Sequence, residues 1–449
     1  MTLKNRKISI LGMSKIGIAA AKLSKSLGAH VFVSELRNFT EDNSDLHLLK
    51  ELNIEFETGK HTERLLDTDL IIKSPGVSPS HPVLISAESK KIPIIGEIDF
   101  ALSLFKGNSK FICFTGTNGK TTSTLLLCHI LKQAGKVYVL SGHRNTPMSE
   151  IVYQDLNPEF IVQEVSCSDL RDNKKIKPDI AVLLNIYPDH LDLFGDFNKY
   201  VETKLSLFQN VKTKIFINEA MKNLIREFFY SVRLNNMEFN QISFFNNQII
   251  LEKFRDVPDY FNGFEDILSA VYQVCRNLGI DDNIIFEGIK SFNPPNHRRQ
   301  VLKKNNITII NDAKGTNVQA LINTLNWVST PVILIAGGKD KGQDFSVLLN
   351  IFIHKVKILI VIGKTGERLK TIAETQGIEV INCISEGLKK AISSAKQIAS
   401  ENDIIMYSPG SSNDDKNFST AEECGEWLIS YFKNAPLQKR KIKVRCKIV

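Results

Sequence analysis

A run rich in glycine and hydroxyl side chains has the residue types that bind phosphate. Residues 115–122 read TGTNGKTT and lie between an apolar run at 111–114 and a helix-like run at 123–133. A strand, a glycine loop and a helix in this order aim backbone N–H groups and the positive helix end at a phosphate. Lys120 would reach the terminal phosphates of a nucleotide, and the Thr121 hydroxyl would bind the bridging Mg²⁺.

The match to the general phosphate-loop pattern is incomplete, because Phe114 occupies the position of its first glycine. An ordinary tight turn with an exposed lysine is the alternative. Because a predicted strand and a predicted helix flank the loop, we expect phosphate binding.

Length and composition describe a chain of several globular domains. The 449 residues suggest two to four domains, and 43 % hydrophobic with 24 % charged residues is a globular balance. No apolar run approaches the roughly 18 residues of a membrane span, and we expect no signal peptide before the first predicted strand. Seven scattered cysteines without a CxxC pair favour reduced thiols in the cytoplasm over disulfides or a zinc site.

The net charge of +8 is partly concentrated in a basic tail at residues 439–447. Such a tail could bind nucleic acid or anionic lipid, or it could be a solvated chain end. We expect the solvated end, no nucleic-acid partner and a monomeric protein.

Residues 1–93 begin like a nucleotide-binding βαβ unit. The expected elements are strands at 7–11, 30–33 and 69–72 and a helix at 18–27. Ser14 replaces the middle glycine of the dinucleotide pattern in GMSKIG, while Glu35 ends the second strand, so another nucleotide diphosphate fits better than NAD. Ser74-Pro75-Gly76 follows the third strand, where open α/β sheets bind ligands, although a plain Pro-Gly turn explains the same residues.

Residues 94–295 contain the phosphate loop and further candidate metal ligands. The expected elements are strands at 111–114, 160–163 and 180–184 and helices at 123–133 and 198–208. Glu164 and His190 follow two of these strands and are candidate Mg²⁺ ligands, although a lone histidine is often structural. Lys204 lies on the second helix. Its position alone predicts only that it belongs to the solvent-exposed face of that helix.

Residues 296–449 have the pattern of a third α/β domain. The expected elements are strands at 307–310, 332–335, 358–362 and 403–407 and a helix at 318–325. Loops rich in glycine and hydroxyl residues follow the strands, which is typical of a doubly wound sheet with one ligand-binding edge. Arg298 and Arg299 lie in the expected hinge, where a basic pair could bind phosphate.

Taken together, these motifs resemble the Mur ligase family, and most closely its D-glutamate-adding branch. The motifs are SPGVS at 74–78, TGTNGKTT at 115–122, EVS at 164–166, NIYPDHLD at 185–192, Lys204, HRRQ at 297–300, NDAKGTN at 311–317, GGKDKG at 337–342 and the segment from SPG at 408–410 to Phe418. The resemblance covers nearly the whole chain in the family's motif order.

The resemblance implies an α/β protein with a Rossmann-like N-terminal domain, a central P-loop mononucleotide-binding domain and a Rossmann-like C-terminal domain. These would bind a UDP-sugar (1–93), ATP (94–295) and an amino acid (296–449). It implies that ATP phosphorylates the carboxylate of UDP-N-acetylmuramoyl-L-alanine and that the amine of D-glutamate then attacks the acyl phosphate. Catalysis would depend mainly on positioning and on charge neutralisation.

The resemblance also implies a role for individual residues. Catalysis would involve Lys120, His190, Lys204 and Arg298. ATP would contact Gly116, Thr117, Asn118, Gly119, Lys120, Thr121, Thr122, Arg298 and Asp312. The UDP moiety would contact Ser14, Lys15, Ile16, Glu35, Arg37, Ser74, Pro75 and Gly76, and D-glutamate would contact Lys314, Thr316, Ser412 and Phe418. Two Mg²⁺ ions would bind Thr121, Glu164, His190 and a carbamylated Lys204.

Four loops depart from the family's pattern, at residues 142–147, 164–170, 262–263 and 408–418. The phosphate and metal motifs are intact, whereas the loops expected to face the sugar, adenine and glutamate are altered. The alternatives are therefore a sister ligase with another amino acid or acceptor, and a UDP-sugar- or nucleotide-binding protein without catalysis. The joint presence of Lys120, Glu164, His190, Lys204 and Arg298 favours an enzyme.

Overall fold

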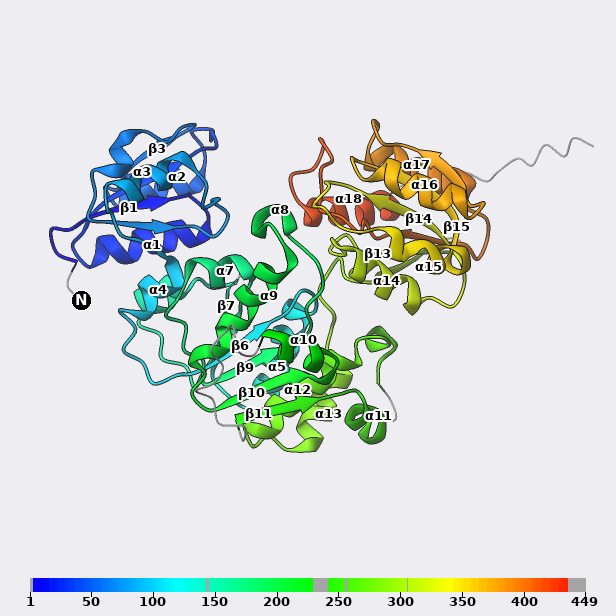
Figure 1. Ribbon diagram of the computed structural model, residues 1–449, viewed down its shortest axis with the longest axis horizontal. Helices are drawn as coiled ribbons and strands as arrows, with labels where there is room; N and C mark the ends of the chain where they lie inside the picture. Colours follow the sequence, from blue (N-terminus) through cyan, green and yellow to red (C-terminus); the bar gives the residue numbers. More distant parts are fainter. Residues whose placement is uncertain (1–2, 143–144, 229–240, 255–256, 305, 435–449) are drawn as a thin grey trace, which may run out of the picture. The chain divides into compact units, whose positions relative to one another are not determined.

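The computed structural model describes residues 3–142, 145–228, 241–254, 257–304 and 306–434. Figure 1 shows the helices and strands coloured along the chain, many of them labelled. The chain divides into two compact units, of which the first holds two parallel sheets and the second holds a third sheet together with residues 187–192.

The first sheet has five parallel strands in the order β3-β2-β1-β4-β5. Its strands are β1 (Lys7–Leu11), β2 (His30–Glu35), β3 (Glu55–Thr58), β4 (Leu70–Lys73) and β5 (Ile94–Gly96), and its helices are α1 (Lys15–Ser26), α2 (Ser44–Glu51) and α3 (Pro82–Ser89). The sheet extends to β5, whereas we expected the second domain to begin at residue 94.

A tight turn joins β1 to α1. A Cβ atom added at Gly17 would lie 1.9 Å from the carbonyl oxygen of Gly12. Only glycine permits this approach, which explains the glycine at this position of the first βα turn. The helix begins at Lys15, three residues before the predicted start, because Ser14 adopts the extended conformation of an N-cap residue.

The second sheet has six parallel strands in the order β11-β10-β9-β6-β8-β7. Its strands are β6 (Lys110–Thr115), β7 (Tyr138–Ser141), β8 (Phe160–Glu164), β9 (Ile180–Leu183), β10 (Lys214–Asn218) and β11 (Ile242–Phe245). The helices of this segment are α4 (Glu97–Leu102), α5 (Lys120–Gln133), α6 (Met148–Tyr153), α7 (Cys167–Asp172), α8 (Leu191–Phe194), α9 (Phe197–Leu205), α10 (Lys222–Phe228), α11 (Gln248–Lys253), α12 (Glu265–Asn277) and α13 (Asp282–Ser291).

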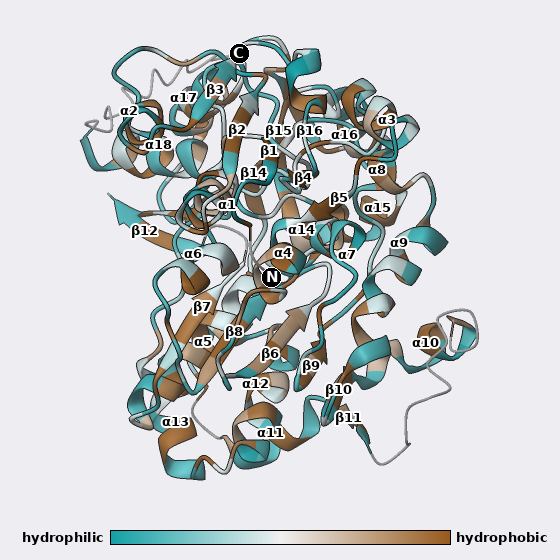
Figure 2. Ribbon diagram, turned by 90° about the vertical axis from the view of Figure 1, so that its left-hand side faces the viewer, coloured by the Kyte–Doolittle hydropathy of each residue, from teal (hydrophilic) through white to brown (hydrophobic). Residues whose placement is uncertain are grey.

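Both faces of the second sheet are covered. Phe111 and Cys113 of β6 pack into a core with α6, α7 and α9, whereas Ile112 and Phe114 pack into another core with α5, α12 and α13. Figure 2 shows the strands of this sheet largely in brown, the colour of hydrophobic residues. A parallel sheet covered on both faces needs apolar residues at consecutive positions, which explains the unbroken apolar run before the phosphate loop.

The third sheet has six strands in the order β12-β13-β17-β14-β15-β16. Its strands are β12 (Gln300–Lys304), β13 (Ile307–Asn311), β14 (Val332–Gly337), β15 (Val356–Ile362), β16 (Glu379–Asn382) and β17 (Ile404–Tyr407), and its helices are α14 (Val318–Trp327), α15 (Leu349–Lys355), α16 (Gly366–Thr375), α17 (Leu388–Ile398) and α18 (Ala421–Asn434). β12 pairs antiparallel with β13, and the other pairs are parallel.

These three sheets confirm the predicted α/β fold class. The domain limits remain a prediction. Among the residues that the structure describes, no helix is both long and apolar enough to cross a membrane. The basic tail lies outside the described residues.

Glu97 is the first residue of α4, which connects the first sheet to the second. Its side chain is fully buried and accepts a hydrogen bond from the Ser149 N–H at 2.5 Å. Burial raises the pKa of this carboxyl from 4.5 to about 7, and the negative charge of Asp169 acts in the same direction.

This raised pKa predicts a stability that falls with pH. Between pH 4.5 and about 7 the folded protein holds a proton on Glu97 that the unfolded chain releases. The free energy of unfolding therefore decreases as the pH rises through this window, by about 3 kcal/mol. Urea unfolding at several pH values should show that Glu97→Gln removes this dependence and stabilises the protein above pH 7.

Glu88→Gln is the matched control, because Glu88 is exposed on α3. The control should keep the pH dependence of the parent protein. Equal pH profiles for the parent and Glu97→Gln would contradict the prediction.

Candidate functional site

The phosphate loop connects β6 to α5 and is held against the end of β9. Gly119 is the N-cap of α5 and has a φ of 89°, a conformation that favours glycine. The Thr117 N–H donates to the Asn185 carbonyl oxygen at 2.9 Å, and the Asn118 N–H donates to the Asn185 side chain at 2.9 Å. The loop is therefore shaped by its own glycine and by one residue of a neighbouring strand end.

Two lysine amines converge on this loop. Lys120 Nζ donates to the carbonyl oxygens of Gly116 at 2.9 Å and Thr117 at 3.1 Å. Lys204 is 1 % exposed. Its Nζ atom donates to the same Gly116 oxygen at 2.9 Å and lies 4.7 Å from the centre of the Tyr200 ring. The structure thus brings together two predicted catalytic residues that are far apart in the sequence.

Thr121 and Glu164 supply oxygen atoms next to these amines. The Thr121 hydroxyl, in the first turn of α5, donates to the Glu164 carboxylate at 2.9 Å. Glu164 ends β8, which neighbours β6 in the sheet. A hydroxyl and a carboxylate at a phosphate loop are hard oxygen donors of the kind that Mg²⁺ prefers, so this part of the predicted metal site fits the ion. Thr122, predicted to contact ATP, is buried within α5.

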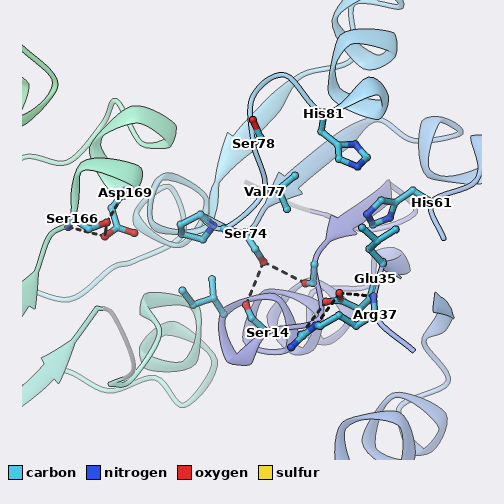
Figure 3. A pocket seen from close by; sticks show the side chains of 15 residues that line it. Ser14, Glu35, Arg37, His61, Ser74, Val77, Ser78, His81, Ser166 and Asp169 are labelled. Carbon is cyan, nitrogen blue, oxygen red and sulfur yellow. Dashed lines mark hydrogen bonds and ion pairs between the residues drawn. The ribbon is translucent and has the colours of Figure 1, made fainter. Parts of the chain in front are cut away.

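A cavity of about 700 Å³ opens beside the first sheet (Figure 3). It is lined by the predicted residues Ser14, Ile16, Glu35, Arg37, Ser74, Pro75 and Gly76, and by Gly12, Leu36, His61, Val77, Ser78, His81, Ser166 and Asp169, which the sequence analysis did not assign to it. Lys15 does not line the cavity and is exposed at the first position of α1.

Glu35 carries a negative charge at the floor of this cavity. Burial favours its neutral form, but hydrogen bonds from Arg37 and from the Met13 N–H outweigh burial and lower the pKa to about 2. The Met13 contact ties the carboxylate to the loop that follows β1. The charged pair of Glu35 and Arg37 is therefore set in place before any ligand binds.

Charged residues of α7 hold the loop that follows β4. Lys73 forms a buried ion pair with Asp172, and Arg171 donates to the carbonyl oxygen of Pro75 at 3.2 Å. Asp172 also accepts from Arg171 at 2.8 Å. The cavity wall at Pro75 is thereby connected to a helix that begins three residues after Glu164.

In the third domain, the loops at the ends of β13, β14 and β17 lie side by side. The Gly410 N–H donates to the Gly315 oxygen at 2.8 Å, and the Lys339 N–H donates to the Ser412 oxygen at 2.8 Å. Gly315 lies between Lys314 and Thr316, so these predicted residues and Ser412 share one sheet edge. Lys314 forms an ion pair with Glu422.

Phe418 and Lys341 lie in other loops of this domain. The Phe418 ring packs 5.7 Å from that of Trp427. Lys341, to which the sequence analysis gave no role, forms a buried ion pair with Asp189 at 3.3 Å. His190 follows with a φ of 54° and donates its N–H to Asp189 at 2.9 Å. Residues 187–192 form one compact unit with the third domain.

The joint role of His190, Glu164 and Lys204 in metal binding stays a prediction. Within the described ranges there is no group of three or more His, Cys, Asp or Glu side chains arranged around a metal position. This finding does not test the predicted site, because two of its ligands, Thr121 and a carbamylated Lys204, are not His, Cys, Asp or Glu side chains.

The two arginines of the hinge have different surroundings. Arg299 is 2 % exposed, donates to the Asn323 oxygen at 2.8 Å and lies 5.4 Å from the Trp327 ring. Arg298, predicted to bind the γ-phosphate, is half-buried. The Asp312 carboxylate accepts from Ser408 at 2.7 Å and Thr324 at 2.8 Å, and its burial raises its pKa despite these bonds and the nearby arginines.

Comparison with known families matches three consecutive parts of the chain. Residues 7–83 match the MurD N-terminal domain, residues 114–286 the Mur ligase middle domain, and residues 297–410 the "Mur ligase, glutamate ligase domain". A curated relative from Elusimicrobium minutum, "UDP-N-acetylmuramoylalanine--D-glutamate ligase", is 32 % identical over 454 residues, covering 96 % of this chain and 98 % of the relative. This chain belongs to the Mur ligase family.

A relative of the same name from a Geobacillus species is 30 % identical over 95 % of this chain and 97 % of its own length. Among solved structures, UDP-N-acetylmuramate-alanine ligase MurC from Thermotoga maritima has a TM-score of 0.58 at 17 % identity, covering 96 % of this chain and 99 % of its own. The pseudomurein peptide ligase type C from Methanothermus fervidus has a TM-score of 0.57 at 20 % identity, covering 95 % and 99 %. These structures establish the fold alone. As a Mur ligase, this chain is an ATP-dependent amide ligase.

Single residues of two of these loops have a clear structural role in this Mur ligase. Asp169 and Ser166 form a capping box, in which each side chain accepts a backbone N–H of the other residue at the start of α7. Gly142 has a φ of 86° and lies against the Glu164 carbonyl oxygen, so the glycine that begins the 142–147 loop is required there. Residues 143 and 144 lie outside the described residues.

The two neighbouring hinge arginines allow a structural role to be separated from a catalytic role, because each can be replaced in the same way. Arg299→Leu removes a buried guanidinium that donates to the Asn323 carbonyl oxygen and offsets the charge of Asp312, so we expect the free energy of unfolding to fall by about 2–4 kcal/mol. Arg298→Leu should change it by less than about 1 kcal/mol while lowering ATP-dependent activity. Urea unfolding and phosphate release should be measured for both variants, and equal stability losses would contradict this division of roles.

Proposed function

We propose that this Mur ligase joins the amine of D-glutamate to the alanyl carboxylate of UDP-N-acetylmuramoyl-L-alanine, with hydrolysis of ATP to ADP and phosphate, in peptidoglycan precursor synthesis. The observation that carries the proposal is the position of the 700 Å³ cavity. It extends from the first sheet to Ser166, which lies two residues after Glu164, and Glu164 contacts Thr121 of the phosphate loop.

The reaction must bring a carboxylate towards the phosphates of ATP, so two anions approach each other. Positive groups that are already in place lower the barrier, because they need no reorganisation during the reaction. Lys120 would bind the β- and γ-phosphates, and Arg298 would bind the γ-phosphate. Together they would offset the charge that accumulates as the acyl phosphate forms.

Two Mg²⁺ ions would neutralise phosphate charge when bound. Thr121, Glu164, His190 and Lys204 would hold them, with Lys204 as a carbamate whose oxygens replace an amine that cannot bind a cation. Asp312 would contact the nucleotide. Lys314, Thr316, Ser412 and Phe418 would hold D-glutamate with its amine towards the activated carboxylate. Because ATP and both substrates are cytoplasmic metabolites, we place the reaction there, with the chain acting as a monomer.

The first test is phosphate release from ATP with purified protein, UDP-N-acetylmuramoyl-L-alanine and either D- or L-glutamate. Release that requires the UDP-sugar and D-glutamate is expected. Release with a different amino acid would indicate a sister ligase. Binding of the UDP-sugar without any release would contradict the enzyme and leave a binding protein.

Lys204→Ala tests the carbamate. We expect a loss of at least about 10²-fold in kcat, partly recovered when a small carboxylic acid supplies the missing oxygens. Burial disfavours the Lys204 ammonium, but contacts with Cys167 and Tyr200 outweigh burial and raise its pKa. Carbamate formation consumes the neutral amine, so the carbamylated fraction should rise with pH and with bicarbonate.

Lys199→Ala is the matched control, because Lys199 is exposed on the same helix. Full activity of the control with no rescue of Lys204→Ala by any carboxylic acid would argue against the carbamate. Urea unfolding of both variants separates loss of fold from loss of chemistry.

A further inference from the structure

A lysine of α17 lies against the ring of Phe418, one of the residues predicted to hold the amino acid. Lys389 is the second residue of this helix and is exposed. Its Nζ atom lies 5.5 Å from the centre of the Phe418 ring, which is within the range of a cation–π contact. A ligand that touches Phe418 is therefore close to a positive charge that none of the roles above includes.

Phe418 belongs to a loop that is bonded to the start of α17. The N–H of Leu388, the first residue of the helix, donates to the Asp415 carboxylate at 2.6 Å. The Asn413 side chain donates to the Phe418 carbonyl oxygen at 2.6 Å, and the Phe418 N–H donates to the Asp415 carbonyl oxygen at 3.2 Å. These bonds hold the Phe418 ring next to Lys389 before any ligand binds.

The four residues predicted to hold D-glutamate carry no surplus positive charge. Thr316, Ser412 and Phe418 are uncharged. Lys314 forms an ion pair with Glu422 in the first turn of α18. Every free amino acid carries an ammonium group and an α-carboxylate at neutral pH. The ion pair and the two hydroxyl groups therefore suit the zwitterionic end that all amino acids share.

The side-chain carboxylate of D-glutamate is the charge that remains to be matched. Lys389 has no ion-pair partner among the residues that the structure describes. Asp415, which binds the start of the same helix, uses its carboxylate to accept backbone N–H groups. Lys341, another lysine of this domain, is paired with Asp189. Lys389 therefore offers a charge that a ligand carboxylate can use.

We propose that Lys389 binds the side-chain carboxylate of the incoming amino acid and thereby selects a dicarboxylic over a neutral amino acid, an inference that rests on the proposed function. The Phe418 ring packs against the methylene groups between the two ends of D-glutamate. The α-carboxylate and the ammonium group lie towards Lys314. An amino acid with a neutral amide in place of the side-chain carboxylate forms no ion pair with Lys389.

The first experiment measures phosphate release from ATP by the unmodified protein, with UDP-N-acetylmuramoyl-L-alanine and either D-glutamate or D-glutamine. D-Glutamine has the same shape and a neutral side chain, and it is tested as a competitive inhibitor if it does not react. We expect the KM for D-glutamate to be at least about tenfold below the KM or inhibition constant of D-glutamine. Added potassium chloride should raise the KM for D-glutamate alone, because salt screens an exposed ion pair. Equal constants for the two amino acids would overturn the proposal.

Variants then assign the discrimination to one side chain. Lys389→Met keeps the length of the side chain over the Phe418 ring but removes its charge, so the KM for D-glutamate should rise about tenfold, with kcat, the KM for ATP and the constant for D-glutamine unchanged. Lys389→Arg keeps the charge and should retain most of the preference for D-glutamate. Lys390→Met, at the next exposed position of α17, is the matched control and should behave like the parent. Urea unfolding should be alike for all three variants, because both lysines are exposed.

The outcomes separate this inference from the proposed function. A full preference for D-glutamate in Lys389→Met would overturn the inference alone, and so would equal losses for both amino acids or an equal loss in Lys390→Met. A parent protein that prefers another dicarboxylic amino acid would contradict the proposed function alone, and the same variants then test Lys389 with that substrate. A parent protein that prefers a neutral amino acid would overturn both.

Discussion

The amines of Lys120 and Lys204 donate to one atom, the carbonyl oxygen of Gly116. Lys204 is almost completely removed from water, so its amine is committed to this one position at the loop. With Lys204 carbamylated, as proposed, its positive charge is replaced by oxygens that would hold Mg²⁺. Lys120 would then offset the negative charge that accumulates in phosphoryl transfer to a carboxylate.

The second sheet is the element that makes this convergence possible. Lys120 begins the helix after β6, whereas Lys204 is on α9, which packs in the core on one face of the same sheet. Glu164 is the last residue of the neighbouring strand β8, and Asn185 follows β9, which lies on the other side of β6. Parallel strands bring their carboxyl ends to one edge, so the ends of β6, β8 and β9 meet there, next to Lys204 of α9.

The first domain is attached to this edge by buried charge. Lys73, Arg171 and Asp172 connect the loop after β4 to the helix that follows Glu164. Buried ion pairs contribute little to net stability, because removal of their charges from water is costly. Such pairs instead fix the orientation of the two segments that they join. Displacing a buried ion pair loses far more interaction free energy than displacing an apolar contact. The cavity thus has a wall at Pro75 that is fixed relative to the strand that ends at Glu164.

Sequence alone determined the parts of this protein whose chemistry is local. The strand, glycine loop and helix around Lys120, the alternation of strands and helices, and the loops of the third domain all follow from short runs of residues, because backbone geometry and hydrophobic patterning act over a few positions. The resemblance to the Mur ligase family assigned Ser14, Glu35 and Ser74–Gly76 to one ligand. The structure places them around one cavity, while their contact with the UDP moiety stays a prediction. The antiparallel edge strand β12 was missed, since Gln300–Lys304 has no apolar run.

Only the tertiary structure decided which distant side chains share an environment. No local sequence feature predicts that Lys204 is buried against Gly116. Its predicted role as a metal ligand came from the family resemblance alone. Arg299 looks like a second phosphate-binding arginine, yet its side chain is buried against Trp327 and donates to the Asn323 carbonyl oxygen. His61 and His81 are 20 residues apart in the sequence, yet both line the cavity beside the first sheet. Burial and hydrogen-bond direction are properties of three-dimensional neighbours, so no local pattern could have supplied them.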